Sequence, residues 1–159
     1  MEKLEIKKDD AIVAHQNAKK SGKELLENLF GKKVFQLDIK ERLKTFDDVL
    51  AENNITIEDF ENSCKGLTSD EIGYRKEKLI VAAYNGNKLP DFTDGSTKYY
   101  PIFKMGSPSG VGFSFSVCDY WNTASDVGSR LVFHGENAKA NMYDAVEKFL
   151  PEYQQSRTT

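Results

Sequence analysis

A cysteine and a histidine in the C-terminal half are the residues best suited to nucleophilic chemistry near neutral pH. Cys118 and His134 fall on segments predicted to be neighbouring strands, so a thiol–imidazole pair on one sheet face is conceivable. Such a pair also needs a third group that orients the imidazole, and the sequence places no acid for that role. The other histidine, His15, lies on a polar part of a predicted helix and is interpreted as a surface residue. We therefore expect that the protein is not an enzyme.

Aspartates near turns come closest to the composition of a metal site. They are Asp91, Asp94, Asp119 and Asp126. Aspartate is favoured at such positions because its carboxylate bonds to nearby backbone groups. The spacing of these four matches no metal-binding loop, and no glycine-rich loop followed by lysine is present to cradle a phosphate. The sequence predicts neither a bound metal nor a cofactor.

Polar side chains gather on one face of the predicted C-terminal sheet. Side chains alternate along a strand, so placing Phe115 and Val117 in the core turns the residues between them outward. One interpretation is that this polar face is simply exposed to solvent and that Arg130 pairs there with Asp119 or Asp126. The other interpretation is that the polar side chains of this face form a binding site, which could hold a phosphate or carboxylate and stack a ring. The candidate ligand-binding residues are Tyr100, Lys104, Ser114, Ser116, Arg130 and His134.

An aromatic pair, Tyr120 and Trp121, stands at the edge of a predicted loop. If these rings are exposed, they mark a surface for contact with a protein partner. A flat apolar patch at this pair would favour a protein partner. A concave pocket at Arg130 would favour a small ligand.

Local patterns predict helices before residue 86. The segments 21–24 and 68–71 have the spacing of a capping box, and Thr45 and Thr56 are further candidate caps. Apolar residues recur at helical spacing after each of these starts. Gly31 and the run 85–87 are typical helix ends.

The pattern changes after residue 86. Strands are predicted at 98–105, 112–120 and 127–134, with Leu131 and Phe133 inward, and hairpin loops at 106–110 and 122–126. A final helix is predicted over 136–155. The fold class is therefore α+β: N-terminal helices followed by a three-stranded antiparallel meander and a C-terminal helix. We expect one domain over 1–159, with a helical part at 1–86 and the sheet plus C-terminal helix at 87–155.

Composition narrows the class of protein. The chain has 159 residues, of which 39% are hydrophobic and 30% charged, which is typical of a globular domain. The formal net charge of −3 provides no general attraction to nucleic acid, which is not expected as a partner. The longest apolar run, 79–84, is far shorter than the roughly 20 residues of a membrane span. Two distant cysteines and the lack of a signal-like N-terminus lead us to expect a cytoplasmic protein.

Several short motifs resemble a family of uncharacterised proteins spread through phages and mobile elements of gut bacteria. They are the runs 22–31, 38–48, 98–101 and 127–133. Ile102 stands where that pattern leads us to expect tryptophan, and Val132 stands where we expect cysteine. The resemblance implies a phage or prophage context and no particular activity.

Three functions are consistent with these patterns. The first is a non-catalytic accessory binding protein of phage or prophage origin that acts on a protein partner in the host cytoplasm. The alternative is a protein that binds or sequesters a small anionic ligand such as a nucleotide. The third is a minor virion component.

Overall fold

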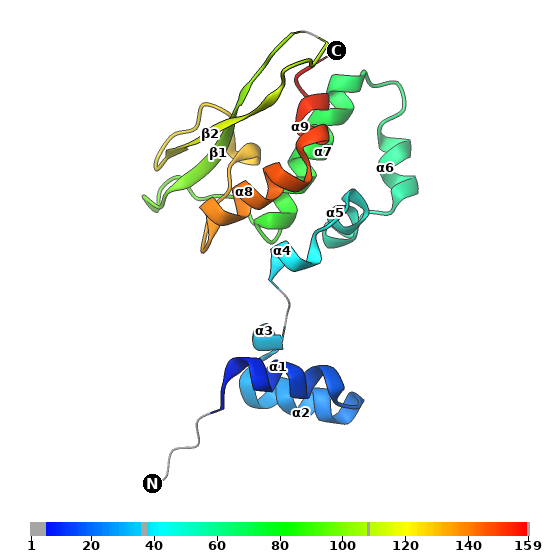
Figure 1. Ribbon diagram of the computed structural model, residues 1–159, viewed down its shortest axis with the longest axis vertical. Helices are drawn as coiled ribbons and strands as arrows, with labels where there is room; N and C mark the ends of the chain where they lie inside the picture. The colour runs from blue at the N-terminus through cyan, green and yellow to red at the C-terminus, as the bar shows by residue number, and fades with distance from the viewer. Residues whose placement is uncertain (1–5, 36–37, 108, 159) are drawn as a thin grey trace. The chain divides into compact units, whose positions relative to one another are not determined.

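The computed structural model describes residues 6–35, 38–107 and 109–158. Contacts divide the chain into two compact units, residues 1–38 and 39–159. The first unit contains helices α1 (Lys8–Asn17), α2 (Lys20–Phe30) and α3 (Lys32–Phe35). The second contains α4 (Ile39–Arg42), α5 (Phe46–Glu52), α6 (Ile57–Ser63), α7 (Ser69–Tyr84), β1 (Lys98–Lys104), β2 (Ser114–Trp121), a 3₁₀ turn η1 (Ser129–Leu131), α8 (Ala138–Lys148) and α9 (Leu150–Gln155) (Figure 1).

The first unit is held together by a polar contact and a small ring cluster. His15 lies 3.0 Å from Glu27, which joins α1 to α2. The His15 ring also stacks on Phe35 with 4.3 Å between the ring centroids, so it is half-buried rather than a simple surface residue. Gly31 ends α2 with a positive φ of 82°, as predicted. The apolar residues Leu25 and Leu29 of α2 are exposed.

The helix starts of the second unit follow the predicted caps. The hydroxyl of Thr45 accepts from the backbone N–H of Asp48, which separates α4 from α5. Thr56 caps α6 in the same way, through the N–H of Asp59. At the start of α7 the carboxylate of Glu71 accepts from a backbone N–H at 2.8 Å. Each bond spans three residues, so the local sequence is sufficient to specify it.

The end of α7 is a Schellman motif built on the run 85–87. The N–H of Asn87 donates to the carbonyl of Ala82, and the N–H of Gly86 donates to Ala83. Gly86 has a φ of 60°, the left-handed conformation that this motif requires. The carbonyls of Ala82 and Ala83 near the end of α7 therefore accept from backbone donors.

The core of the second unit lies between α7, the C-terminal helices and the sheet (Figure 1). The predicted C-terminal helix is broken at Phe149 into α8 and α9, because Phe149 leaves helical geometry and Pro151 stands in the first turn of a new helix. Phe115, which the sequence pattern placed in the core, is only half-buried, as are Phe46 and Leu79. The fully buried apolar cluster comprises Leu43, Val49, Ile80, Val81, Ala83, Tyr84, Phe113, Phe133, Ala138, Met142, Ala145, Val146, Phe149 and Tyr153.

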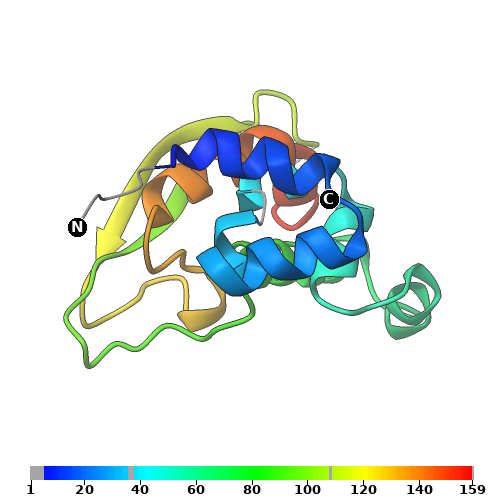
Figure 2. The same ribbon diagram turned by 90° about the horizontal axis from the view of Figure 1, so that it is seen from below.

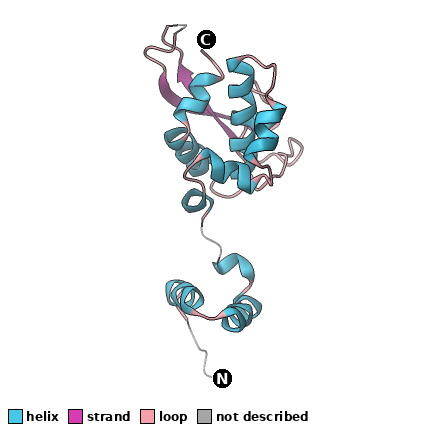
Figure 3. Ribbon diagram, turned by 90° about the vertical axis from the view of Figure 1, so that its right-hand side faces the viewer, coloured by secondary structure: helices cyan, strands magenta, loops and turns pink. Residues whose placement is uncertain are grey.

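The fold class is α+β, and the sheet of the described residues has two antiparallel strands rather than the predicted three (Figure 3). The segment 127–134 contributes a single bridge between Phe133 and Tyr99 of β1. Gly128, with a φ of 82°, leads into η1, so this segment cannot continue as a strand. Leu131, Val132 and Phe133 are all buried, which replaces the predicted alternation of inward and outward residues. The bridge joins β1 and not β2, so the predicted meander is absent from the described residues.

A bulge changes which residues of β2 face outward. Ile102 lies opposite Val117, but the next residue, Phe103, lies opposite Phe115, so Ser116 is the extra residue. The shift moves Val117 to the open face, where it is 50% exposed, although the sequence pattern placed it in the core. The predicted loop 106–110 connects the strands, and its residue 108 lies outside the described residues.

Candidate functional site

The structure separates the six residues predicted for ligand binding. Tyr100 is only 5% exposed, and its hydroxyl accepts from the indole N–H of Trp121 at 2.9 Å. Burial raises the pKa of Tyr100, which keeps this phenol neutral and engaged. Lys104 and Ser114 are cross-strand partners at the other end of the sheet. These residues form no common surface with Arg130.

Tyr120 and Trp121 are exposed, at 58% and 44%, but they occupy opposite faces of β2. Tyr120 pairs with Tyr99, with 5.9 Å between the ring centroids. Trp121 donates to Tyr100 and to Asp126. The two rings therefore do not form one patch.

The thiol and the imidazole considered for chemistry make different contacts. The sulfur of Cys118 lies 3.4 Å from the hydroxyl of Tyr143, and this hydrogen bond raises the pKa of Tyr143. The ring of His134 lies 2.9 Å from the backbone carbonyl of Lys88. His134 thus ties its own segment to the connection that follows α7.

Arg130 lines a cavity of about 480 Å³ beside the C-terminal half of α7. Lys78 on α7 and Lys88 in the next connection line it as well. We call this the Arg130 cavity. Its other lining residues are amides, a hydroxyl and apolar side chains: Asn53, Leu79, Val81, Ala82, Asn85, Asn87, Leu89, Pro90 and Ser129. Among the described residues, three cations and no carboxylate line it, so it is suited to an anionic group.

Asparagine side chains hold the walls of the Arg130 cavity in place. Asn85 donates to the carbonyl of Val132 at 2.8 Å and accepts from the backbone N–H of His134. Asn53 donates to the carbonyl of Leu79 at 3.0 Å. In Figure 2 the green 85–97 connection and the yellow-to-orange 122–137 segment run alongside one another, joined by these bonds. Three separate stretches of sequence are thereby fixed around one hollow.

The cations of the Arg130 cavity are not committed elsewhere. Among the described residues, the side chains of Arg130 and Lys88 make neither an ion pair nor a hydrogen bond, and both are exposed. The ammonium of Lys78 lies 5.6 Å from the ring of Tyr74, a weak contact at an exposed site. Glu52, at the end of α5, pairs with Arg42. These cations therefore remain available for a ligand.

Sequence reasoning found Arg130 and missed its two partners. Lys78 lies on a helix between apolar residues of the predicted stripe, and Lys88 follows a helix end without any special pattern. The Asn85–Asn87 run was recognised as a helix stop, but its second use, in bonding to the 132–134 segment, depends on tertiary contact. The polar residues just after the end of this helix are the feature of the sequence that could have indicated the partners of Arg130.

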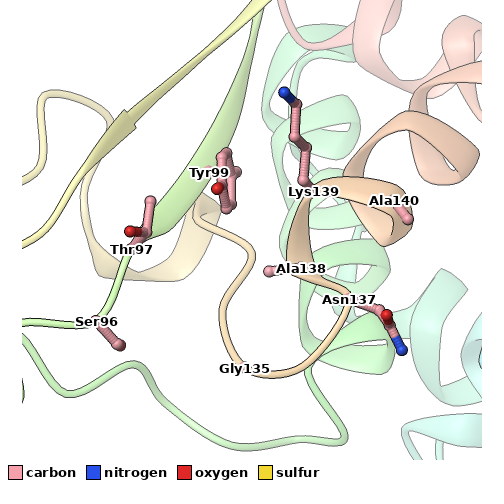
Figure 4. A pocket seen from close by; sticks show the side chains of 8 residues that line it. All are labelled: Ser96, Thr97, Tyr99, Gly135, Asn137, Ala138, Lys139 and Ala140. Carbon is pink, nitrogen blue, oxygen red and sulfur yellow. The ribbon is translucent and has the colours of Figure 1, made fainter.

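A second hollow, of about 490 Å³, lies between the start of β1 and the start of α8 (Figure 4). Tyr99 and the hydroxyl residues Ser96 and Thr97 line one side, and the 135–140 segment lines the other. Of the described residues that line it, Lys139 alone is charged, and in Figure 4 its side chain extends away from the hollow. This hollow is therefore a weaker candidate for an anion than the Arg130 cavity.

Within residues 6–35, 38–107 and 109–158, no three His, Cys, Asp or Glu side chains converge where they could hold a metal ion. No helix in the same part of the chain is long and apolar enough to cross a membrane.

Comparison with known proteins found no matching family model, no matching curated protein and no matching solved structure.

Proposed function

We propose that this chain is a non-catalytic accessory binding protein of phage or prophage origin that acts on a protein partner in the host cytoplasm. Its Arg130 cavity would hold an anionic group of that partner. The observation that carries this proposal is a concave site lined by Lys78, Lys88 and Arg130, with no carboxylate among the described residues that line it. In a chain of net charge −3, this local excess of positive charge does not follow from composition.

The contacts of the candidate reactive residues favour binding over catalysis. His134 bonds to a backbone carbonyl, and Cys118 lies against Tyr143. A general base must reach the proton that it removes, usually through a hydrogen bond to the nucleophile. A ring that secures a loop is better explained as a structural element of the binding site.

A small anionic ligand is the second candidate. The volume of the Arg130 cavity, about 480 Å³, falls within the roughly 300–1,000 Å³ common for small-molecule sites. None of the described residues that line it is aromatic, so a nucleotide base would find no ring among them to stack on. A compact phosphate or carboxylate therefore fits this cavity better than a whole nucleotide.

Capture from host extract tests the proposal. The tagged full chain should retain one or more host proteins, and the double variant Lys88→Ala, Arg130→Ala should lose them. Removing one charge-assisted bond costs about 1.5–3 kcal/mol, so even Arg130→Ala alone should weaken binding by roughly 10- to 150-fold. Raising the salt concentration should weaken capture in the same way, because exposed charges are screened.

Lys104→Ala is the matched control, since Lys104 is an exposed lysine of β1 outside the cavity. Equal capture by the wild type, the double variant and the control would refute the assignment of the site. Calorimetric titration with inorganic phosphate and with a nucleoside triphosphate tests the second candidate. Heat that depends on Arg130, without protein capture, would favour the small ligand.

A further inference from the structure

We propose that the group recognised by the Arg130 cavity is an acidic side chain on a short extended peptide. An apolar side chain two residues along that peptide would occupy a second cavity, on the α6 side of Lys78 and Leu79. This inference rests on the proposed function and names the chemistry of the partner. It follows from the position, lining and charge of the two cavities.

The second cavity has a volume of about 390 Å³ and lies between α6 and α7. Its apolar lining consists of Ile55, Phe60 and Leu79. Phe60 packs edge-on against Phe46, with 5.2 Å between the ring centroids, which fixes the wall of this cavity. An aliphatic or small aromatic side chain would be desolvated there. We call this the Phe60 cavity.

The two cavities adjoin one another on α7, which fits an extended peptide. Residues 75, 78 and 79 line the Phe60 cavity and residues 78, 79, 81 and 82 line the Arg130 cavity, so Lys78 and Leu79 line both. Side chains that fill the two cavities must therefore be neighbours on the same side of a bound peptide. Alternate side chains of an extended chain lie on one side, about 6.6 Å apart. One peptide can therefore fill both cavities with residues i and i+2.

Charge determines which peptide fits. In the part of the chain that the structure describes, the two cavities are lined by four cations, Arg75, Lys78, Lys88 and Arg130, and by one carboxylate, that of Asp59. Asp59 is engaged at the start of α6, where it accepts from the hydroxyl of Thr56 at 2.7 Å. The lining is thus positive overall, which favours Asp or Glu in the peptide and disfavours Lys or Arg.

Fluorescence anisotropy with fluorescein-labelled octapeptides tests this inference on the full chain. The probes carry Asp or Glu at one position and Leu two residues away, in either chain direction. Replacing the acid with Asn, or the Leu with Ser, should each weaken binding at least tenfold. Moving the Leu next to the acid should have the same effect, because adjacent side chains of an extended peptide point to opposite sides.

Two protein variants separate the roles of the cavities. Arg130→Ala should reduce affinity at least tenfold for the acidic probes and leave the Asn probes unchanged. Ser63→Trp places a large ring at the exposed rim of the Phe60 cavity and should remove the preference for Leu over Ser. Ile55→Ala, which widens the same cavity, should shift the preference towards a larger apolar side chain. Lys104→Ala should bind like the wild type.

The outcomes distinguish this inference from the proposed function. Binding of host protein or phosphate that depends on Arg130, with no preference for an apolar residue at i+2, would overturn the peptide inference alone. If neither peptides, phosphate nor host proteins respond to Arg130→Ala, the proposed function fails as well. Peptide binding that is unchanged by both Ser63→Trp and Ile55→Ala would exclude the Phe60 cavity.

Discussion

The ion pair between Glu77 and Arg157 offers a sharp test of how the second unit is held together. Glu77 on α7 is only 2% exposed. The guanidinium of Arg157 donates to both of its carboxylate oxygens, at 2.6 and 2.8 Å, and the hydroxyl of Ser156 donates a third bond at 2.9 Å. Arg157 also lies over the ring of Phe103 at 4.7 Å. Arg157→Ala would leave a carboxylate buried without its counter-ion.

The expected cost follows from these contacts. Removing one partner of a buried pair costs about 3–5 kcal/mol, because the remaining charge stays desolvated. The side chain of Arg157 is 22% exposed, so water can enter when it is removed, and we expect the lower end, about 3 kcal/mol. Loss of the contact with Phe103 adds about 0.5–1 kcal/mol. For a unit of this size, the melting temperature should fall by roughly 10–15 °C.

Thermal and urea unfolding followed by tryptophan fluorescence measures this loss. Trp121 is the single tryptophan of the chain, so the signal reports on the second unit. The double variant Glu77→Leu, Arg157→Leu should recover most of the stability, because neither charge is then left alone. Arg75→Ala, an exposed arginine on the same helix, should change stability by less than about 0.5 kcal/mol. A loss below 1 kcal/mol for Arg157→Ala, or a double variant less stable than the single one, would refute this account.

Three further predictions concern the same unit. Phe149→Ala should cost about 3–5 kcal/mol in urea unfolding, whereas Phe115→Ala should cost less because Phe115 is only half-buried; equal losses would contradict the observed packing. Tyr153→Phe should be neutral or stabilising by up to about 1 kcal/mol, since the buried hydroxyl has no hydrogen-bond partner among the described residues; a loss above 1 kcal/mol would reveal a partner. The bond from Lys98 lowers the pKa of Asp94 to about 2, so its stabilising contribution is present above about pH 4 and lost as the pH falls through 2. The stability difference between Asp94→Asn and the wild type should therefore shrink from pH 5 to pH 2, and a constant difference would argue against the pair.

Helix boundaries were predictable where a few neighbouring residues form the whole interaction. Thr45 and Thr56 cap helices through backbone groups three residues away, and Gly86 ends α7 through its own left-handed conformation. These bonds involve no distant residue, so the local sequence contains all the information that they need. The same applies to the α+β class, because the spacing at which apolar residues recur changes from helical to strand-like after residue 86.

The predicted third strand shows where that reasoning fails. Leu131 and Phe133 suited the inward side of a strand, yet Val132 between them is buried as well. The segment lies against α7 on one side, through Asn85, and against β1 on the other, through Tyr99. Burial from both sides removes the alternation that identifies a strand with one open face. The bulge at Ser116 has a similar effect on Val117, because one extra residue reverses the facing of those beyond it.

The candidate site depends on tertiary structure in the same way. From the sequence alone, Arg130 was a cation that could bind an anion, and its expected companions were on neighbouring strands. In the structure, Lys78 and Lys88 are its companions, brought to it by the fold of α7 and by the bonds of Asn85. Glu77 likewise finds Arg157 eighty residues further along the chain. The sequence by itself determined the caps of α5, α6 and α7, the helix ends and the fold class, because those interactions are local. The capping box predicted at 21–24 is not formed, since α2 begins at Lys20 without a side-chain cap. The shape of the cavity and the pairing of distant charges were decided only by the packed chain, because they require groups that are remote in sequence to meet.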